Sequence, residues 1–311
     1  MMTAMTNNNG LSRLNKAPLL TPRSWLFVPA MRSDRFIKAM NSGADAVIID
    51  LEDAVDATHK QQARQNVASF VLDQQQKPDE RSFLPHLWLR INNPDQDEVS
   101  WQSDMQLCHQ LIDSNNDSEQ SNSSKLAGII LPKVSSSAQV RQVTQQLQTP
   151  VIAQIESALG ISNLTDITQV SGLQAISYGR LDIANELNLR TGSQAEADFF
   201  GQLRMQMLIA SKAHHLMAPI ESIYANFKDT EAMTSVAGYA SDLGFSGMLC
   251  IHPSQVAVVN QAFNVTEQQL QFAKQVIDHY KQTGDSIFAI DGVMVDLPVI
   301  LQCQRLLESN S

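Results

Sequence analysis

The chain has 311 residues, of which 43% are hydrophobic and 17% are charged, so a sizeable core is possible and a chain that is disordered throughout is excluded. Its formal net charge at pH 7 is −10 and no dense basic run occurs, which argues against nucleic acid as the main partner. The three cysteines, Cys108, Cys250 and Cys303, form no CxxC or Cys/His cluster, which argues against a zinc site and fits a reducing cytoplasm.

The chain begins with a polar segment. Residues 1–22 lack the apolar core of a signal peptide, and we expect them to form a flexible tail. No apolar run of about 18 residues occurs, so we expect no membrane-spanning segment. Together with the cysteine usage, these features predict a cytoplasmic protein.

Short apolar runs alternate with helix-like segments from residue 24 onward. We predict strands at residues 24–30, 46–53, 86–92, 127–133, 150–155, 173–178, 218–223 and 247–253. The segments between them read as helices, and further helices follow from residue 254, at 267–281 and at the C-terminus. Residues 113–125 contain no apolar residue, and we interpret them as a surface insertion without a chemical role.

This alternation predicts the fold. Eight short buried strands separated by helices over roughly 240 residues are typical of a (β/α)8 TIM barrel, here at residues 23–265 and followed by a C-terminal helical extension at 266–311. A doubly wound sheet is the alternative, but it usually has fewer strands, and no GxGxxG motif follows the first strand.

Charged or polar residues stand at or just beyond most of the predicted strand ends. They are Glu52, Asp53, Arg90, Lys133, Glu156, Asp182, Glu221 and His252. In a barrel these ends form one face, where active sites are built. Glu156 and Asp182 follow two strands joined by a helix, which are usually parallel neighbours, so we expect the two carboxylates to converge. Because such a pair repels unless a proton or cation lies between, and Mg²⁺ takes one or two protein carboxylates, we predict a Mg²⁺ site.

A series of motifs follows in order along the chain. They are WLFVPA, VIIDLEDAV, K..AR (Lys60, Ala63 and Arg64), LRIN, ILPK, QIESALG, YGRLDIANELN, GFSGMLCIHPSQV and DGVMVDLP. With them, the chain from residue 24 to its end resembles the citrate lyase beta-subunit-like branch of the HpcH/HpaI aldolase family. The resemblance implies a (β/α)8 barrel, assembled as a trimer or hexamer. It also implies a Mg²⁺-dependent carbon–carbon lyase acting on acyl-CoA thioesters such as malyl-CoA or citramalyl-CoA.

The resemblance also implies roles for individual residues. Glu156 and Asp182 correspond to the metal ligands, and Arg90 corresponds to the substrate arginine. Asp296, in MVDLP, is similar to an aspartate that a neighbouring subunit lends to the site, which implies that residues 266–311 form helices and a lid for that subunit. The chain departs from the family pattern at Ser135, Leu181 and Glu221, where Glu, an acidic residue and Asp are common, and these departures concern the substrate more than the reaction type.

The implied reaction cleaves a 3-hydroxyacyl thioester into a 2-oxo acid and the enolate of acetyl-CoA. Mg²⁺ orients the oxo acid, and a fixed guanidinium, for which Arg90 is the candidate, stabilises the enolate oxygen. In the reverse direction Asp296 is a candidate base, or else simply an acid at a helix N-terminus. Glu52 and Asp53 either hold metal-bound waters or orient Arg90, or they pair with basic residues at the barrel mouth.

The roles of the basic residues and of the histidine stay open at this stage. Lys60 and Arg64 either bind the phosphates of CoA or form a solvated helix face. Lys133 is a candidate substrate contact, and in a Schiff-base aldolase it is the nucleophile. His252 is more typical of a structural hydrogen bonder than of a base.

The sequence leaves other functions open. One is a metal aldolase that acts on free 2-oxo acids without CoA. Another is a subunit that works only with an acyl-carrier partner, as in citrate lyase complexes. A non-catalytic binding protein on the same fold is also compatible with the sequence, because a fold does not fix a function.

Overall fold

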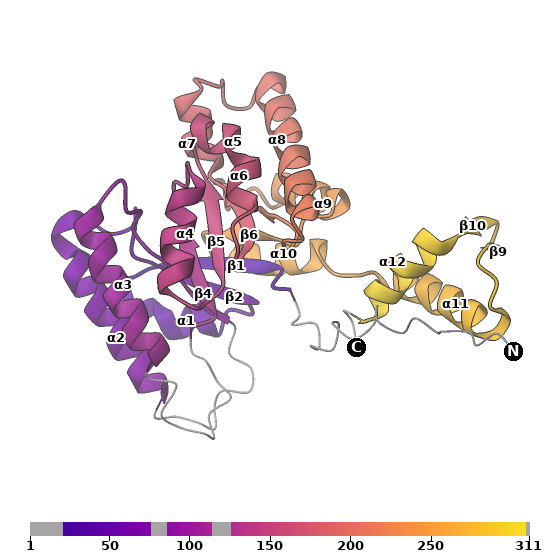
Figure 1. Ribbon diagram of the computed structural model, residues 1–311, viewed down its shortest axis with the longest axis horizontal. Helices are drawn as coiled ribbons and strands as arrows, with labels where there is room; N and C mark the ends of the chain where they lie inside the picture. Colours follow the sequence, from indigo (N-terminus) through magenta and orange to yellow (C-terminus); the bar gives the residue numbers. More distant parts are fainter. Residues whose placement is uncertain (1–20, 76–85, 114–125, 309–311) are drawn as a thin grey trace, which may run out of the picture. The chain divides into compact units, whose positions relative to one another are not determined.

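The computed structural model describes residues 21–75, 86–113 and 126–308 (Figure 1). Residues 1–20 of the predicted N-terminal tail lie outside these ranges, as does the predicted insertion at residues 113–125 except for Asp113, which ends a helix. The chain divides into two compact units, Pro22–Phe263 and a second unit that contains residues 264–308. No described helix combines the length and the apolar composition that a membrane span requires.

The first unit is a closed parallel barrel (Figure 1). Its strands are β1 (Ser24–Pro29), β2 (Ala46–Asp50), β3 (His86–Arg90), β4 (Gly128–Leu131), β5 (Val151–Ile155), β6 (Leu173–Tyr178), β7 (Ile220–Glu221) and β8 (Gly247–Cys250). Each strand pairs with the next, and β8 closes the barrel by pairing in parallel with β1. The predicted (β/α)8 fold is therefore confirmed.

The barrel interior is filled by alternate residues of the strands. A buried cluster lies there, made of Trp25, Ala46, Ile48, Trp88, Ile130, Ile152, Ala175, Ile220 and Leu249. The rings of Trp25 and Trp88 meet edge to face, with centroids 5.1 Å apart. Most of the other apolar strand residues face the helices and join the larger outer core. Burial on both faces explains why the strands read as nearly continuous apolar runs.

Helices follow the strands and cover the barrel. They are η1 (Ser33–Arg35), α1 (Phe36–Met40), η2 (Ala57–His59), α2 (Lys60–Gln75), α3 (Glu98–Asp113), α4 (Ser137–Gln146), α5 (Ala158–Ser162), α6 (Leu164–Thr168), α7 (Arg180–Glu186), α8 (Gln194–Ala213), α9 (Thr230–Leu243) and α10 (Ser254–Ala262). Two details differ from the prediction. The helix expected between the strands at residues 150–155 and 173–178 is broken at Asn163 into α5 and α6, and the short helix α7 was not expected.

The second unit is a small helical pair with a hairpin. It contains α11 (Glu267–Thr283), β9 (Phe288–Ile290), β10 (Val293–Val295) and α12 (Leu297–Glu308), packed around a core that includes Val276, Val295 and Ile300. The hairpin was not predicted. Its two-residue loop is Asp291-Gly292, with φ of 49° and 82°, and this pair is a strong hairpin signal because both positions need positive φ.

A buried polar network lies where β6 and β7 face α8. Glu221 accepts hydrogen bonds from Arg204 at 2.8 and 3.0 Å and from the Tyr178 hydroxyl. The Tyr178 ring stacks on Phe200, with centroids 5.9 Å apart. Burial, followed by the charge of Glu221, raises the pKa of Tyr178 well above its usual range, so the phenol remains a donor. The network therefore binds α8 to the barrel wall.

Tyr178→Phe is expected to lower the free energy of unfolding by about 1.5–3 kcal/mol, because it removes a buried hydrogen bond to a charged group while keeping the ring. Urea unfolding measures this effect. Tyr239→Phe is the control, since Tyr239 is half exposed and phenylalanine keeps the ring that lies 5.6 Å from the Arg204 guanidinium, and its expected change stays within about 0.5 kcal/mol. Equal effects of the two substitutions would contradict the account of the network.

Candidate active site

Arg90 is fixed at the end of β3 by the carboxylate at the end of β2. Asp50 and Arg90 are partners in the strand register, and Arg90 donates to Asp50 through Nε at 2.8 Å and through Nη2 at 2.6 Å. Its guanidinium also lies over the Phe27 ring, 4.8 Å from the centroid. Burial alone lowers the pKa of Arg90, but the charge and hydrogen bonds of Asp50, together with the charges of Glu52 and Glu156, outweigh it and the pKa is raised. Arg90 is therefore a permanently charged, pre-oriented donor.

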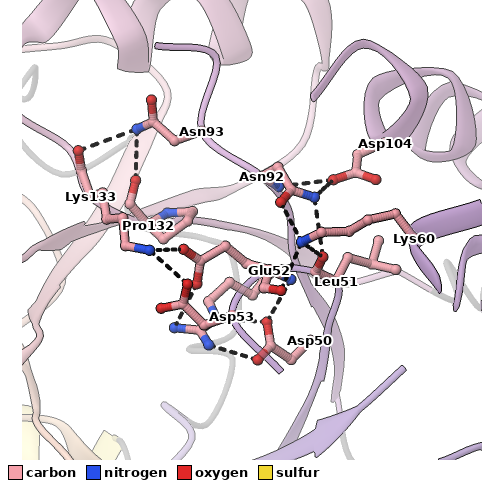
Figure 2. A network of polar contacts seen from close by, with 11 residues as sticks. Asp50, Leu51, Glu52, Asp53, Lys60, Asn92, Asn93, Asp104, Pro132 and Lys133 are labelled. Atoms are coloured by element: carbon pink, nitrogen blue, oxygen red, sulfur yellow. Dashed lines mark hydrogen bonds and ion pairs between the residues drawn. The ribbon is translucent and has the colours of Figure 1, made fainter. Parts of the chain in front are cut away.

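Lys133, which follows β4, forms an ion-paired cluster with the acids that follow β2 (Figure 2). Its ammonium contacts Glu52 and lies 2.7 Å from Asp53. Its backbone has φ of 51°, in the left-handed region that few non-glycine residues adopt. Burial lowers the pKa of Lys133, but the hydrogen bonds to Asp53 and Glu52 outweigh it, and the pKa is raised. Lys133 is thus a cation rather than a free amine.

The Schiff-base hypothesis for Lys133 therefore lacks support in the structure, since a nucleophilic lysine needs a lowered pKa. Borohydride added to the protein with pyruvate is expected to leave its mass unchanged, as measured by intact mass spectrometry. A stable adduct of pyruvate on Lys133 would contradict this prediction. Lys228, in the exposed loop before α9, serves as the internal reference for non-specific reduction, measured by peptide mapping.

Glu156 lies at the barrel mouth directly after β5, and only 5% of the residue is exposed. Its Oε2 has no hydrogen-bond partner among the described residues. Gly179, after β6, makes room for it, because a Cβ at Gly179 would lie 2.8 Å from Glu156 Oε1. Burial raises the pKa of Glu156 to about 8, with the charges of Arg90 opposing and those of Glu52 and Asp182 adding to the rise. An unpartnered buried carboxylate is thus built into the mouth.

Asp182 stands in the first turn of α7, just beyond β6, and it is exposed. Its charge contributes to the raised pKa of Glu156, which indicates that the two carboxylates lie close enough to interact. Glu186, also on α7, accepts a hydrogen bond from the backbone N–H of Ala158 at 3.0 Å and so ties α7 to the turn that follows Glu156.

The donor set fits Mg²⁺. This ion takes one or two carboxylates and leaves its other positions to water and substrate, and Glu156 Oε2 is an oxygen with no hydrogen bond in the part of the chain that the structure describes. Within residues 21–75, 86–113 and 126–308, no group of three or more His, Cys, Asp or Glu side chains is arranged to hold a metal ion. The pair of Glu156 and Asp182 differs from the four Cys or His ligands of a structural zinc site.

The structure corrects the interpretation of Lys60. Its ammonium is buried and donates to the carbonyls of Leu51 and Glu52, both at 2.8 Å, and to Asn92 Oδ1 at 2.7 Å (Figure 2). Lys60 is therefore neither a phosphate ligand nor part of a solvated helix face, because all three N–H donors of its ammonium are used inside the protein. Lys60 instead fixes the turn that carries Glu52 and Asp53.

Arg64 is also engaged within the protein. Its guanidinium lies 3.0 Å from Asp104, a fully buried carboxylate on α3. The same carboxylate accepts from the backbone and side-chain amides of Asn92, at 2.8 and 2.6 Å (Figure 2). The Arg64 side chain is 18% exposed, so a contact with CoA phosphates stays a prediction for this residue. Its guanidinium would then bind a phosphate while it remains paired with Asp104.

Two other predicted residues of the barrel, Glu221 and His252, are not part of this cluster, and Asp296 is described within its own unit. Glu221 turns away to Arg204 and Tyr178. His252 is exposed, stacks on Phe227 with ring centroids 4.6 Å apart, and its Nδ1 lies 2.8 Å from Ser254 Oγ, in keeping with a structural role. Asp296 belongs to the second unit, where its Oδ1 accepts from the N–H of Val299 at 3.3 Å in the first turn of α12. Its role toward a neighbouring subunit stays a prediction.

The positions that depart from the family pattern have separate surroundings. Ser135 stands before α4, and its N–H donates to Gln139 Oε1 at 2.8 Å. Leu181 is 54% exposed on α7, beside Asp182.

Two polar residues at strand ends were missed by sequence reasoning, Asp50 and Gln154. The signal for both was available, because each shares a strand face with an interior residue two positions earlier, Ile48 for Asp50 and Ile152 for Gln154.

Comparisons with known proteins agree with this geometry. Residues 23–253 match the family model described as HpcH/HpaI aldolase/citrate lyase, which confirms the predicted family and enzyme class. A citrate lyase subunit beta-like protein of Deinococcus radiodurans is 29% identical, over 96% of this chain and 100% of that protein. An L-malyl-CoA/beta-methylmalyl-CoA lyase of Cereibacter sphaeroides is 29% identical, over 94% and 96%. Among solved structures, protein CitE from Mycobacterium tuberculosis, in complex with magnesium, acetoacetate and coenzyme A, is 26% identical. The match covers 94% of this chain and 99% of the CitE chain, with a TM-score of 0.71.

Proposed function

Because the chain belongs to the HpcH/HpaI aldolase/citrate lyase family, we propose that it is a Mg²⁺-dependent carbon–carbon lyase for a 3-hydroxyacyl-CoA thioester such as malyl-CoA or citramalyl-CoA. The thioester is cleaved to, or formed from, acetyl-CoA and a small 2-oxo acid. The observation that carries this proposal is the buried Glu156 carboxylate with an unpartnered oxygen, beside Asp182 and near the fixed Arg90. The lyase of Cereibacter sphaeroides and the CitE complex with magnesium and coenzyme A support it.

In this proposal Glu156 and Asp182 hold the metal ion, which supplies Lewis-acid polarisation of the oxo acid. Arg90 presents its guanidinium to the thioester oxygen, where negative charge develops when the carbon–carbon bond breaks. Asp50 keeps Arg90 in one orientation through two hydrogen bonds, so little reorganisation accompanies the charge. Lys133 either contacts the substrate or neutralises the charges of Glu52 and Asp53 at the carboxyl end of the barrel.

We further propose a cytoplasmic homo-oligomer, a trimer or hexamer, in which Asp296 in the second unit serves as the base at the site of a neighbouring subunit. Mixing an inactive Glu156→Ala protein with an inactive Asp296→Asn protein is then expected to restore part of the activity after subunit exchange, because some hybrid sites have both residues intact. The measurement is the lyase rate of the mixture against each parent. Two Asp296→Asn preparations, one carrying an affinity tag, are the control, and no gain in rate with demonstrated hybrids would contradict the proposal.

Calorimetry tests the proposed function directly. Mg²⁺ is titrated first, followed by acetyl-CoA together with glyoxylate or pyruvate. Metal binding followed by metal-dependent binding of acetyl-CoA is the expected result. Binding of the oxo acid without acetyl-CoA would favour a metal aldolase on free 2-oxo acids instead, and absence of Mg²⁺ binding would remove the basis of the proposal.

A subunit that needs an acyl-carrier partner is the second candidate function. It is favoured by the similarity to a citrate lyase subunit beta-like protein over almost the whole chain. The purified protein alone separates the two, because a carrier-dependent subunit binds Mg²⁺ and the oxo acid but leaves acyl-CoA thioesters unchanged.

A further inference from the structure

A helix of only seven residues carries Asp182. This helix, α7 (Arg180–Glu186), follows β6, and Asp182 lies in its first turn. Helices shorter than about 12 residues are marginal without tertiary contacts, so α7 does not hold its position by itself. Its orientation, and with it the direction of the Asp182 carboxylate, therefore depends on the contacts that α7 makes with its surroundings.

Arg180, the first residue of α7, is held by the long helix α8. Its Nε donates to Glu196 Oε1 at 3.2 Å, and its Nη2 lies 3.0 Å from the same oxygen. The guanidinium also lies over the Phe200 ring, 4.7 Å from the centroid. Glu196 and Phe200 are four residues apart on α8 and therefore share one face of that helix. Arg180 is thus fixed between a carboxylate and an aromatic ring of α8.

The neighbouring backbone is tied to the same place. The N–H of Arg180 donates to Oγ of Ser222, the residue after β7, at 3.1 Å. The second oxygen of Glu196 accepts from the N–H of Gly192 at 2.7 Å, in the loop that joins α7 to α8. The Glu196 side chain is only 4% exposed, and both of its oxygens are used. One buried carboxylate therefore fixes the beginning of α7 and the loop that follows α7.

Asp182 lies on the opposite side of α7 from Arg180. Successive residues of an α-helix are turned by about 100°, so residues two positions apart are turned by about 200°. The charge of Asp182 raises the pKa of Glu156, so these two carboxylates lie close enough to interact. Holding Arg180 against α8 therefore sets the rotation of α7 about its axis and directs Asp182 toward Glu156.

We propose that Arg180 and Glu196 are positioning residues for the metal site, because their ion pair holds α7 in the rotation that places Asp182 beside Glu156. This inference rests on the proposed function, in which Glu156 and Asp182 hold Mg²⁺. A buried ion pair adds little net stability compared with apolar packing, so the geometry that the pair fixes is its main contribution. Both residues act through Asp182 and are not metal ligands themselves.

Arg180→Met removes the charge and the contact with Glu196, while an apolar side chain still covers Phe200. We expect this variant to bind Mg²⁺ about 10-fold more weakly, since groups that orient metal ligands typically contribute about 10- to 100-fold to metal affinity. Its melting temperature without Mg²⁺ is also expected to fall, because Glu196 is left buried without its cation. Calorimetry on the full chain, at a temperature where circular dichroism shows it to be folded, measures the affinity.

Arg204→Met is the matched control. Arg204 is on the same helix and makes the same kind of contact, with Glu221 at 2.8 and 3.0 Å, but this contact ties α8 to β7 and not to α7. Its melting temperature is expected to fall as well, whereas its Mg²⁺ dissociation constant is expected to change by less than about twofold. The comparison therefore separates positioning of the metal site from a general loss of stability.

Glu196→Gln is a second variant that tests the inference if Arg180→Met does not fold. An amide has a single acceptor oxygen, so glutamine cannot hold both Arg180 and the N–H of Gly192, and Mg²⁺ binding is expected to weaken. Wild-type Mg²⁺ affinity in the folded variants would overturn the inference, and so would an equal loss of affinity in Arg204→Met. If the wild type itself binds no Mg²⁺, the proposed function fails, which is distinct from variants that bind Mg²⁺ as the wild type does.

Discussion

Glu156→Ala protein is expected to bind no Mg²⁺ in a calorimetric titration that saturates the wild type, and its lyase activity is expected to fall by about 10³-fold or more. The physical reason is that Glu156 supplies a buried oxygen with no other partner, whereas Asp182 alone is an exposed carboxylate. Folding should survive the change, because the buried carboxyl group has no hydrogen bond at Oε2 to lose and is costly to ionise, as its pKa of about 8 indicates.

Asp166→Asn is the control for this result. Asp166 is an exposed carboxylate on α6, so its loss removes the same charge from the same unit without touching the mouth. Thermal melting provides an independent readout, because Mg²⁺ should raise the melting temperature of the wild type and of Asp166→Asn but not that of Glu156→Ala. Equal Mg²⁺ affinity in wild type and Glu156→Ala would show that the metal site lies elsewhere.

Arg90→Lys is expected to lower kcat by about 10²–10³-fold with little change in Mg²⁺ affinity, as is typical when a donor to a developing oxyanion is lost. Lysine carries the same charge but cannot make the two parallel hydrogen bonds that Arg90 makes to Asp50, at 2.8 and 2.6 Å. Steady-state kinetics with and without saturating Mg²⁺, alongside calorimetry, measures the effect.

Arg23→Lys is a matched control for Arg90→Lys. Arg23 also makes a two-point contact, with Asp45 at 2.7 and 3.1 Å, but it precedes β1 at the amino ends of the strands. Both substitutions are expected to weaken an arginine–aspartate pair, and only Arg90→Lys is expected to reduce kcat. If both variants keep the wild-type kcat, Arg90 is a structural residue of the barrel wall rather than part of the chemistry.

The barrel itself was readable from the sequence because parallel barrel strands are buried on both faces and stand out as short apolar runs. The predicted strands at residues 46–53 and 247–253 were too long, since the paired strands end at Asp50 and Cys250. The placement of Glu156 and Arg90 at one mouth followed from topology alone, because the strand ends of a barrel meet on one face.

The partners of individual side chains were not readable. Lys60 begins α2, and its long side chain turns back to three acceptors in two different loops, a contact that no local pattern encodes. Glu221 was misplaced for a simpler reason. Ile220 lies in the barrel interior, so the next residue in the strand, Glu221, points outward to Arg204 on α8. The prediction considered only that Glu221 is at a strand end and did not consider which face of the strand it is on.

Mg²⁺-dependent cleavage of a carbon–carbon bond is the proposed reaction, and product analysis with the purified protein detects it. Malyl-CoA and citramalyl-CoA are incubated with the protein in the presence of Mg²⁺ or EDTA, and acetyl-CoA, free CoA and the 2-oxo acid are quantified. We expect equal amounts of acetyl-CoA and glyoxylate or pyruvate, formed only with Mg²⁺. Free CoA with malate or citramalate, cleavage that persists in EDTA, or no reaction of either thioester would overturn the proposed function.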